Sequence, residues 1–583
     1  MSKFPLGYKK IGEIHLEELE RQYDEKNPQD QGKYAPFHIE SLQNYNPLYN
    51  EIFELSSSNY NSISLNQKYH FLDLEKVLDS KTDIIVSKDS FIKFSPLLDP
   101  VRYLIGKYQK KEDSLDITVL PSFNKESHPK LATINNASYV DNFFCYLSSQ
   151  ILNNNGLING IDYYGSYLGI QEKHKMNIAD DIEYLNQSDF FLKNRNSLYE
   201  MDEVEDPFSN FGSRCNKNKL DIHNSSEVSQ FSVEDLDVDV DVEIDVEIDV
   251  EPVVLDTNEE PEELLYEKDE TNESTDDESN NSETNYTSDE ESDSEETDKE
   301  ESTSEGSTSE ESTSEKSVDE ESTSEGSSSE ESEEPTIFAY IKNFPIQMIC
   351  LEKCQGTIDE LFSKGEIDDT NGAGALFQII MTLIAYQKAF HFTHNDLHTN
   401  NIVYIETKEE FIYYKFNKNI YKVPTYGKIF KIIDFGRAIY RLNGKIYCSD
   451  SFDVGGDAST QYNCEPFFNE KKPRLDPNYS FDLCRLGCSI YDFILDEEID
   501  ENEEVDDLQR TVIRWCSDDN GKNVLYKKNG DERYPNFKLY KMIARSVNKH
   551  DPVSQLEDPY FKQFLSGEES LDMVNIDAIP CFV

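Results

Sequence analysis

Apolar and polar positions follow two periods along the chain, one typical of strands and one typical of helices. In the first third, short apolar runs at residues 90–94 and 160–169 predict strands. The stretch between them, 139–152, has apolar residues at helical spacing and predicts a helix. Folded structure is therefore expected up to about residue 194.

The pattern resumes at residue 336 and becomes more helical toward the C-terminus. Residues 375–391 are almost uninterruptedly apolar and predict a buried helix, and helix-like segments dominate from Asp482 onward. Short strands are predicted at 345–351, 402–405 and 429–433, with a hairpin at 411–421. Strands followed by helices favour an α+β fold with two lobes.

Residues 201–335 separate these two regions and are strongly acidic. Residues 231–335 hold 44 Asp and Glu against 3 Lys, a charge of -41 out of the -62 of the whole chain. Residues 301–330 are three copies of a ten-residue Ser/Glu-rich repeat with almost nothing to bury, and residues 238–250 alternate Val or Ile with Asp or Glu. We expect a disordered acidic insertion, extended at 238–250 because its carboxylates repel one another.

This charge also limits the partners of the protein. Binding to nucleic acid or to an anionic membrane depends on Lys and Arg, so neither is expected, and basic proteins or cations are the expected partners. No apolar stretch reaches the roughly 18 to 20 residues that span a bilayer, and no apolar region follows the N-terminus.

Ten cysteines include no CxxC pair. The two CxxxC pairs, Cys350/Cys354 and Cys484/Cys488, lie in apolar segments, which favours buried thiols over a metal site or a disulfide. Together with the missing apolar leader, this predicts a soluble intracellular protein in a reducing compartment.

Two polar segments next to predicted strands carry candidate chemistry. Residues 394–401 read HNDLHTNN, and residues 434–436, directly after the predicted strand 429–433, read DFG. Phosphoryl transfer needs a carboxylate that orients or accepts a hydroxyl proton, which Asp396 could supply, and oxygen ligands for Mg²⁺, which Asn401 and Asp434 could supply. A metal site formed by His391, His394 and His398 is the alternative for the first segment.

With these motifs the sequence resembles the protein-kinase superfamily, and it is most similar to the divergent protein-kinase-like proteins of giant DNA viruses. The resemblance covers about residues 90–170 and 336–564 and implies ATP and Mg²⁺ as cofactors. It implies a two-lobed protein-kinase-like α+β fold with the acidic insertion between the lobe-forming segments. The protein would then be soluble in the cytoplasm of a host cell, and packaging in a virion is compatible with this.

The resemblance also implies a role for each candidate residue. Asp396 and His398 would be catalytic, Asn401 and Asp434 would bind the metal, and His394 and Asp482 would be structural, with Asp482 holding the backbone of the catalytic loop. The nucleotide would be bound by Lys93 at its phosphates, by Glu352 and Cys354 at adenine, and by Leu351 behind them as the gatekeeper.

The chain departs from the family pattern at several positions. No GxGxxG precedes Lys93, and the helix expected to pair with that lysine contains no Glu, Asp141 being its only acid. Asn395 replaces an Arg that in many kinases grips a phosphorylated activation segment. His398 replaces a Lys and resembles haspin-like, choline and aminoglycoside kinases.

The resemblance divides the chain into five segments. They are residues 1–80 as an N-terminal extension or part of the N-lobe, 81–200 as N-lobe, 201–335 as the insertion, 336–356 as the last N-lobe strand and hinge, and 357–583 as C-lobe. The expected function is an ATP-dependent Ser/Thr protein kinase with a protein substrate, for which a basic protein is one candidate. A pseudokinase scaffold that recruits basic partners and a small-molecule kinase are the alternatives.

Overall fold

A computed structural model describes residues 3–10, 14–108, 116–123, 125–202, 336–495, 505–527, 530–535, 537–568 and 570–583, and all of them fall within one compact unit. Helices and strands are mixed, as expected for an α+β protein. The acidic insertion predicted at 201–335, including the alternating stretch 238–250, lies outside the described residues except for Met201 and Asp202.

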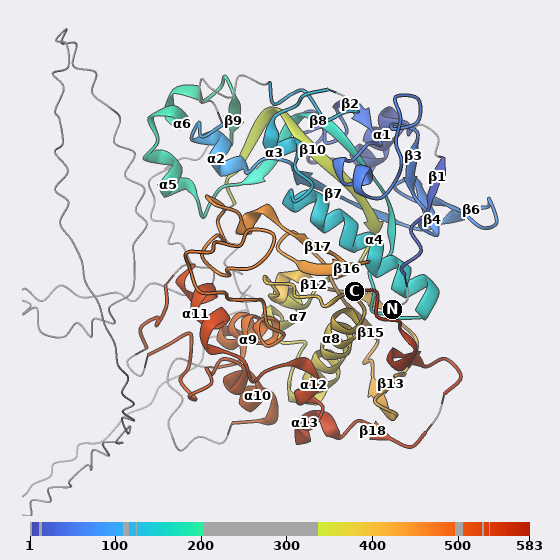
Figure 1. Cartoon of the computed structure of the whole chain (residues 1–583), viewed down its shortest axis with the longest axis vertical. Helices are drawn as coiled ribbons and strands as arrows, with labels where there is room; N and C mark the ends of the chain where they lie inside the picture. The colour runs from blue at the N-terminus through green and yellow to red at the C-terminus, as the bar shows by residue number, and fades with distance from the viewer. Residues whose placement is uncertain are drawn as a thin grey trace, which may run out of the picture. The chain divides into compact units, whose positions relative to one another are not determined.

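The largest sheet is antiparallel and has the strand order β2-β8-β10-β7, with β9 pairing with β10 (Figure 1). Its two central strands are the longest and most buried in the sheet. The predicted strands at 90–94, 160–169 and 345–351 are confirmed as parts of β7, β8 and β10. The bounds are β2 (Ile39–Gln43), β7 (Ser90–Pro96), β8 (Tyr163–Asn177), β9 (Tyr199–Met201) and β10 (Phe338–Glu352).

The acidic insertion leaves and re-enters this sheet at neighbouring points. The backbone N–H of Asp202 donates to the carbonyl of Phe338 across 3.1 Å, and that of Ile178 donates to the carbonyl of Ile337. Because the two ends are already held together, a long insertion costs little additional closure entropy.

Helix α4 (Ala137–Asn155) lies between this sheet and the helical half of the unit (Figure 1). It begins two residues before the predicted segment 139–152, because Asn136 caps its first turn by accepting a hydrogen bond from Ser138 N–H. It ends at Gly156, whose left-handed φ of 74° suits a glycine. Every residue from Ser138 to Ile151 is buried, so both sides of the helix are packed.

Smaller elements surround the main sheet. The N-terminal segment 1–80 contributes β2 to that sheet, and its Phe4 ring packs edge-on against Phe582 at 4.9 Å, which brings the two chain ends together (Figure 1). The elements are β1 (Tyr8–Lys10), α1 (Leu16–Lys26), η1 (Pro47–Glu51), β3 (Ile63–Leu65), β4 (Tyr69–Asp73), β5 (Lys76–Asp79), β6 (Ile85–Ser87), α2 (Pro100–Leu104), α3 (Pro129–Ala132), α5 (Ile182–Asn186) and α6 (Asp189–Asn194).

Helix α8 (Asp369–Phe390) is the central helix of the C-terminal half. It begins six residues before the predicted start at Ala375, with a capping box between Asp368 and Asn371. Its first turns contain Gly374, where an added Cβ would lie 2.8 Å from the carbonyl oxygen of Pro424. Close packing therefore requires a glycine at this position, and this glycine interrupts the apolar pattern of the sequence. The helix is apolar and long enough to span a bilayer. However, 94% of its most apolar stretch is buried inside the protein, which agrees with a soluble protein.

The other helices and short sheets of this half pack around α8. The predicted hairpin at 411–421 is β13 and β14, and β18 and β19 from the C-terminus extend its sheet. The strands are β11 (Gly356–Thr357), β12 (Ile402–Glu406), β13 (Phe411–Phe416), β14 (Asn419–Pro424), β15 (Lys428–Ile432), β16 (Ile439–Leu442), β17 (Lys445–Cys448), β18 (Leu565–Ser566) and β19 (Val574–Asn575). The helices are α7 (Ile358–Ser363), η2 (Thr399–Asn401), η3 (Asp450–Phe452), α9 (Phe481–Ile494), α10 (Asp507–Trp515), α11 (Lys538–Ser546), α12 (Pro552–Gln555), α13 (Pro559–Lys562) and η4 (Ile576–Ala578).

The cysteines in the described part of the chain are free thiols. Cys350, Cys484 and Cys488 are buried and Cys354 is half-buried. The prediction of buried thiols is therefore confirmed for Cys350, Cys484 and Cys488, whereas Cys354 is only half-buried.

Candidate functional site

Two loops meet at the ends of β12 and β15. These strands pair antiparallel with Ile402 opposite Ile432, so Asn401, just before β12, lies opposite Ile433, just before Asp434. The N–H of Ile433 donates to the carbonyl of Asn401 across 3.0 Å. The ring of His394 lies with Nε2 2.9 Å from the carbonyl of Ile433. The HNDLHTNN and DFG segments therefore form one site.

Both loops contain residues with left-handed backbone conformations. The φ values of His391, Asn395 and Asp434 are 48°, 64° and 61°. Such conformations cost free energy in residues other than glycine and often mark functional loops. His391 is the C-cap of α8.

Lys93 of β7 connects three segments that are far apart in the sequence. Its Nζ lies 2.7 Å from Oδ2 of Asp141 on α4 and 2.8 Å from Oδ1 of Asp434. The Lys93 side chain is 28% exposed, that of Asp141 1% and that of Asp434 45%. The Asp434 carboxylate is therefore open to the site, whereas that of Asp141 is buried. Asp141 thus pairs with Lys93 although the helix lacks a glutamate.

The charges at this contact reinforce one another. Burial lowers the pKa of Lys93, but Asp141 and Asp434 outweigh it and hold that pKa above its usual range. Burial raises the pKa of Asp434, but the charge and hydrogen bond of Lys93 lower it to about 2. Asp434 is therefore ionised at neutral pH.

Asp141 also fixes the start of the DFG segment. Its Oδ1 accepts a hydrogen bond from the backbone N–H of Phe435 across 2.9 Å. Phe435 is buried, with its ring 4.6 Å from that of Phe144 and 5.7 Å from that of His394. One carboxylate on α4 thus holds both Lys93 and the DFG backbone.

Asp396 receives an unexpected partner from α11. The hydroxyl of Tyr540 donates to Oδ1 of Asp396 across 2.6 Å, and Nη1 of Arg437 lies 3.6 Å from Oδ2. Burial raises the pKa of Asp396, but Arg437, Arg485 and the Tyr540 hydroxyl together lower it below its usual value. Asp396 is therefore a carboxylate at neutral pH.

Asn401 is held in one orientation by its amide nitrogen. Nδ2 donates to the carbonyl of Asp396 across 2.9 Å and lies 3.1 Å from Nε2 of His398. Burial lowers the pKa of His398, which keeps its ring neutral and able to accept this bond. Oδ1 of Asn401 accepts no hydrogen bond from the described residues and, beside the Asp434 carboxylate, fits a second Mg²⁺ ligand.

Asp482, buried at the start of α9, holds the backbone of the first loop. Its two oxygens accept hydrogen bonds from the N–H groups of His394 and Asn395, across 2.9 and 2.8 Å. This is the contact expected of it. The Asn395 side chain in turn accepts a hydrogen bond from the hydroxyl of Tyr462 across 2.9 Å.

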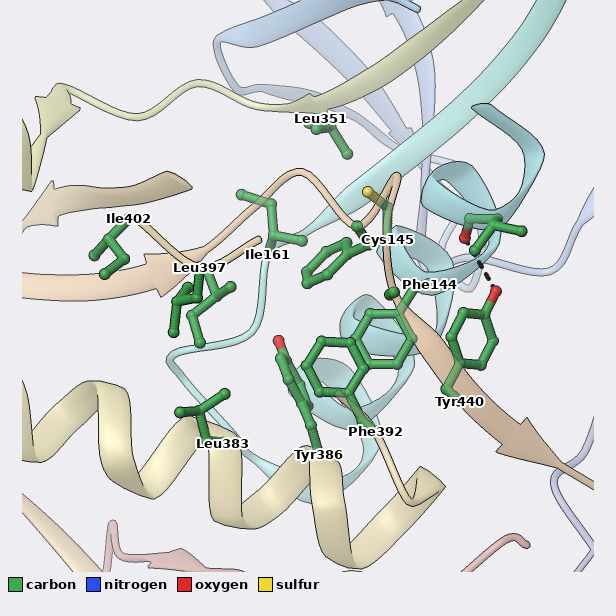
Figure 2. Close-up of a cluster of buried hydrophobic side chains, with 14 of the residues drawn as sticks. Phe144, Cys145, Ile161, Leu351, Leu383, Tyr386, Phe392, Leu397, Ile402 and Tyr440 are labelled. Carbon is green, nitrogen blue, oxygen red and sulfur yellow. Dashed lines mark hydrogen bonds between the residues drawn. The ribbon is translucent and has the colours of Figure 1, made fainter. Parts of the chain in front are cut away.

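The three predicted adenine-site residues lie at the end of β10. The strand pairs Ile349 with Lys93 and Leu351 with Phe91, so Leu351 is two residues beyond the Lys93 partner. Figure 2 shows the Leu351 side chain pointing into an apolar cluster with Ile161 and Cys145, with α8 residues on its far side.

Beyond Leu351 the chain is held by backbone hydrogen bonds, such as that from Glu352 N–H to the carbonyl of Asp162 across 3.0 Å, and by the Glu352 side chain. Oε1 of Glu352 accepts hydrogen bonds from Lys431 Nζ across 2.6 Å and from Asp162 N–H across 2.7 Å. The Cys354 N–H donates to no described residue, which leaves it available to a ligand.

As the sequence indicated, no glycine-rich loop precedes Lys93 among the described residues. Strands β4 to β6, residues 69–87, contain no glycine, and the turn between β4 and β5 is only two residues long. No group of three or more His, Cys, Asp or Glu side chains in the described part of the chain forms a metal site, so nothing here favours the three-histidine alternative.

The sequence alone did not identify Tyr540, Arg437 or Arg485. Arg437 directly follows DFG, but no spacing connects it with the other two. Tyr540 lies 144 residues from Asp396 and reaches it only through the packing of α11 on α9.

No protein-family model matches this sequence, and no curated protein matches it.

Proposed function

We propose that this protein is an ATP- and Mg²⁺-dependent phosphotransferase of the protein-kinase superfamily that phosphorylates serine or threonine hydroxyls in a protein. The observation that carries the proposal is the contact of Lys93 with both Asp141 and Asp434. It unites a strand, a helix and a loop from separate parts of the chain around one ammonium group. An ion pair that only stabilised the fold would not require the Asp434 carboxylate to be 45% exposed. Here that carboxylate is exposed next to the HNDLHTNN loop.

A protein-kinase-like two-lobed fold fits the strand order β7-β10-β8, with α4 between this sheet and the helical half. In this proposal the sheet with α4 is the N-lobe, and β10 continues into the hinge. Leu351 would be the gatekeeper, and the backbone of Glu352 and Cys354 would hold adenine.

Lys93 would clamp the nucleotide phosphates while Asp141 fixes its position. Asp434, ionised because of Lys93, and Oδ1 of Asn401 would hold Mg²⁺, which takes one or two carboxylates together with phosphate oxygens. The bound metal would offset negative charge on the phosphates.

Asp396 would orient the acceptor hydroxyl and take its proton. Its lowered pKa suits a group that must be ionised to accept a hydrogen bond. His398 would support Asn401, since its neutral ring accepts from the Asn401 amide. His394 and Asp482 would keep the loop in place.

The proposal is tested first by binding. We expect Mg²⁺-ATP to raise the melting temperature of the wild-type protein and to have little effect on Lys93→Met and Asp434→Asn. The matched control is Asp572→Asn, which removes an exposed carboxylate from the C-terminal segment and should respond as the wild type does. An equal shift in Asp434→Asn would contradict the metal assignment.

Transfer is tested with labelled ATP and a panel of basic and acidic proteins. Labelling of serine or threonine that disappears in Asp396→Asn is expected. Labelling of small hydroxyl compounds alone would support the small-molecule kinase instead.

A second candidate is a pseudokinase scaffold that binds nucleotide and recruits basic partners through residues 231–335. It is favoured by one specific observation, that Tyr540 and Arg437 already occupy Asp396. This candidate predicts a thermal shift with Mg²⁺-ATP and no labelling of any acceptor, in the wild type and in Tyr540→Phe alike.

A further inference from the structure

The segment after DFG is anchored to the start of α4 by a buried acid. Asp450 lies in η3, after the β16–β17 hairpin, and its side chain is 8% exposed. Its Oδ1 accepts a hydrogen bond from the N–H of Ala137, the first residue of α4, across 3.2 Å. Its own N–H donates to the carbonyl of Asn135 across 2.7 Å.

A lysine completes this contact. Nζ of Lys130, at the short helix α3, lies 2.6 Å from Oδ2 of Asp450. A carboxylate at a helix N-terminus is favoured by the free N–H groups and by the helix dipole, more so where it is partly buried. Asp450 thus joins the segment after DFG to the start of α4 through a hydrogen bond and to α3 through an ion pair.

The same helix carries Asp141 one turn further on. Four residues separate Ala137 from Asp141, a rise of about 6 Å. A shift of the helix start therefore moves the carboxylate that pairs with Lys93. The hairpin adds to this coupling, since the hydroxyl of Tyr440 donates to the carbonyl of Val140 across 3.0 Å, drawn as the dashed line in Figure 2.

We propose that Asp450 is a positioning residue for the nucleotide site, which holds α4 so that Asp141 stays on Lys93 without any phosphate on the segment after DFG. This rests on the proposed function. Asn395 also contacts the segment after DFG, because its side chain accepts a hydrogen bond from the hydroxyl of Tyr462.

The test compares Asp450→Asn with the wild type in Mg²⁺-ATP affinity, in KM for ATP and for the acceptor, and in kcat. We expect affinity for Mg²⁺-ATP to fall by about tenfold, the strength of a favourable charge at a helix terminus. KM for the acceptor should stay unchanged. Asp450→Glu should restore part of the affinity, and Asp453→Asn, an exposed neighbour, should have no effect.

A double variant separates positioning from general loss of structure. If Asp450 acts through Asp141, adding Asp450→Asn to Asp141→Asn should cause little further loss of affinity, whereas independent effects would multiply. Lys130→Met removes the other partner of the ion pair, whose side chain is more exposed than that of Asp450. It should also lower the affinity for Mg²⁺-ATP, and it tests the ion pair even if Asp450→Asn folds poorly.

The outcomes are distinct. A wild-type protein that binds no Mg²⁺-ATP overturns the proposed function and this inference with it. Binding by the wild type with unchanged affinity in Asp450→Asn and Lys130→Met, or with multiplicative losses in the double variant, overturns this inference alone. Loss of ATP binding after phosphatase treatment would also overturn it.

Discussion

The hydroxyl of Tyr540 donates a hydrogen bond to Oδ1 of Asp396 across 2.6 Å, on the carboxylate that would receive the acceptor hydroxyl in the proposed reaction. The ring is held firmly. It stacks on Phe537 with centroids 5.0 Å apart, and its oxygen accepts a hydrogen bond from Nε of Arg485 across 2.9 Å. In the proposed reaction an acceptor hydroxyl would therefore compete with Tyr540 for the Asp396 carboxylate.

Tyr540→Phe should increase transfer to a protein acceptor by up to about tenfold, the equivalent of one hydrogen bond to a charged group. Affinity for Mg²⁺-ATP should not change. Because the Tyr540 hydroxyl helps to lower the pKa of Asp396, the acid limb of the pH–rate profile should move to higher pH. Steady-state rates measured across the pH range would show both effects.

The matched control for this variant is Tyr526→Phe. It removes another tyrosine–aspartate hydrogen bond, 2.7 Å from Tyr526 to Asp492, without touching Asp396. A decrease in rate for Tyr540→Phe alone would mean that the hydroxyl orients Asp396 and does not obstruct it.

Asp141→Asn should weaken Mg²⁺-ATP binding by about tenfold or more, since hydrogen bonds to charged groups contribute about 1.5–3 kcal/mol. The amide would lose the charge that fixes Lys93. Asp141→Glu, which supplies the residue that the family resemblance implies for this helix, should retain more affinity. Calorimetric titration measures this, with the exposed Asp180→Asn as the control. Equal affinities in all three variants would contradict the role of Asp141.

Asp434 should stabilise the folded protein in a pH-dependent manner. Its folded-state pKa of about 2 lies below the ordinary value of about 3.9, so the stabilisation is present above that value and is lost as pH falls toward 2. The difference in unfolding free energy between wild type and Asp434→Asn should therefore shrink between about pH 4 and pH 2. Denaturant unfolding at several pH values measures it.

Asp482 provides a comparison of opposite sign. Burial raises its pKa, so its ionisation costs stability as pH rises through the folded-state value. The wild type should lose stability relative to Asp482→Asn as the pH increases above about 4. If the stability difference between wild type and variant changed with pH in the same direction at both positions, neither pKa shift would govern stability.

Lys431 is a buried charge on β15 that pairs with Glu352 at the end of β10. Its side chain is 2% exposed, and Nζ contacts Glu352 at 2.6 Å and the carbonyl of Gly160 at 2.8 Å. Lys431→Met should lower the unfolding free energy by about 3–5 kcal/mol, because it leaves Glu352 unpaired in a mostly buried setting. Adding Glu352→Gln should recover part of this loss.

Lys428→Met is the control for Lys431 on the same strand. It breaks a more exposed ion pair with Glu366 at 3.5 Å and should cost no more than about 1 kcal/mol. Equal costs at the two positions in denaturant unfolding would contradict a special role for the buried pair.

The sequence by itself determined the local elements and the two polar loops. Periodicity predicts β7, α4, β8, β10, the β13–β14 hairpin and β15, because each has its own apolar repeat. The HNDLHTNN and DFG segments were recognisable because their residues lie close together in the chain. The start of α8 was missed because Gly372 and Gly374, which allow close packing, break the apolar pattern.

Tertiary structure alone decided which side chains face one another. Nothing local connects Lys93 with Asp141 and Asp434, Asp396 with Tyr540, or Asp450 with Lys130, since each contact depends on how β7, α4 and α11 pack. The family resemblance singled out Asp141 as the only acid of the helix expected to pair with Lys93, but only the approach of α4 to β7 brings the two groups into contact. Contacts between charged groups act over a few ångströms in space, whereas sequence patterns report only neighbours along the chain.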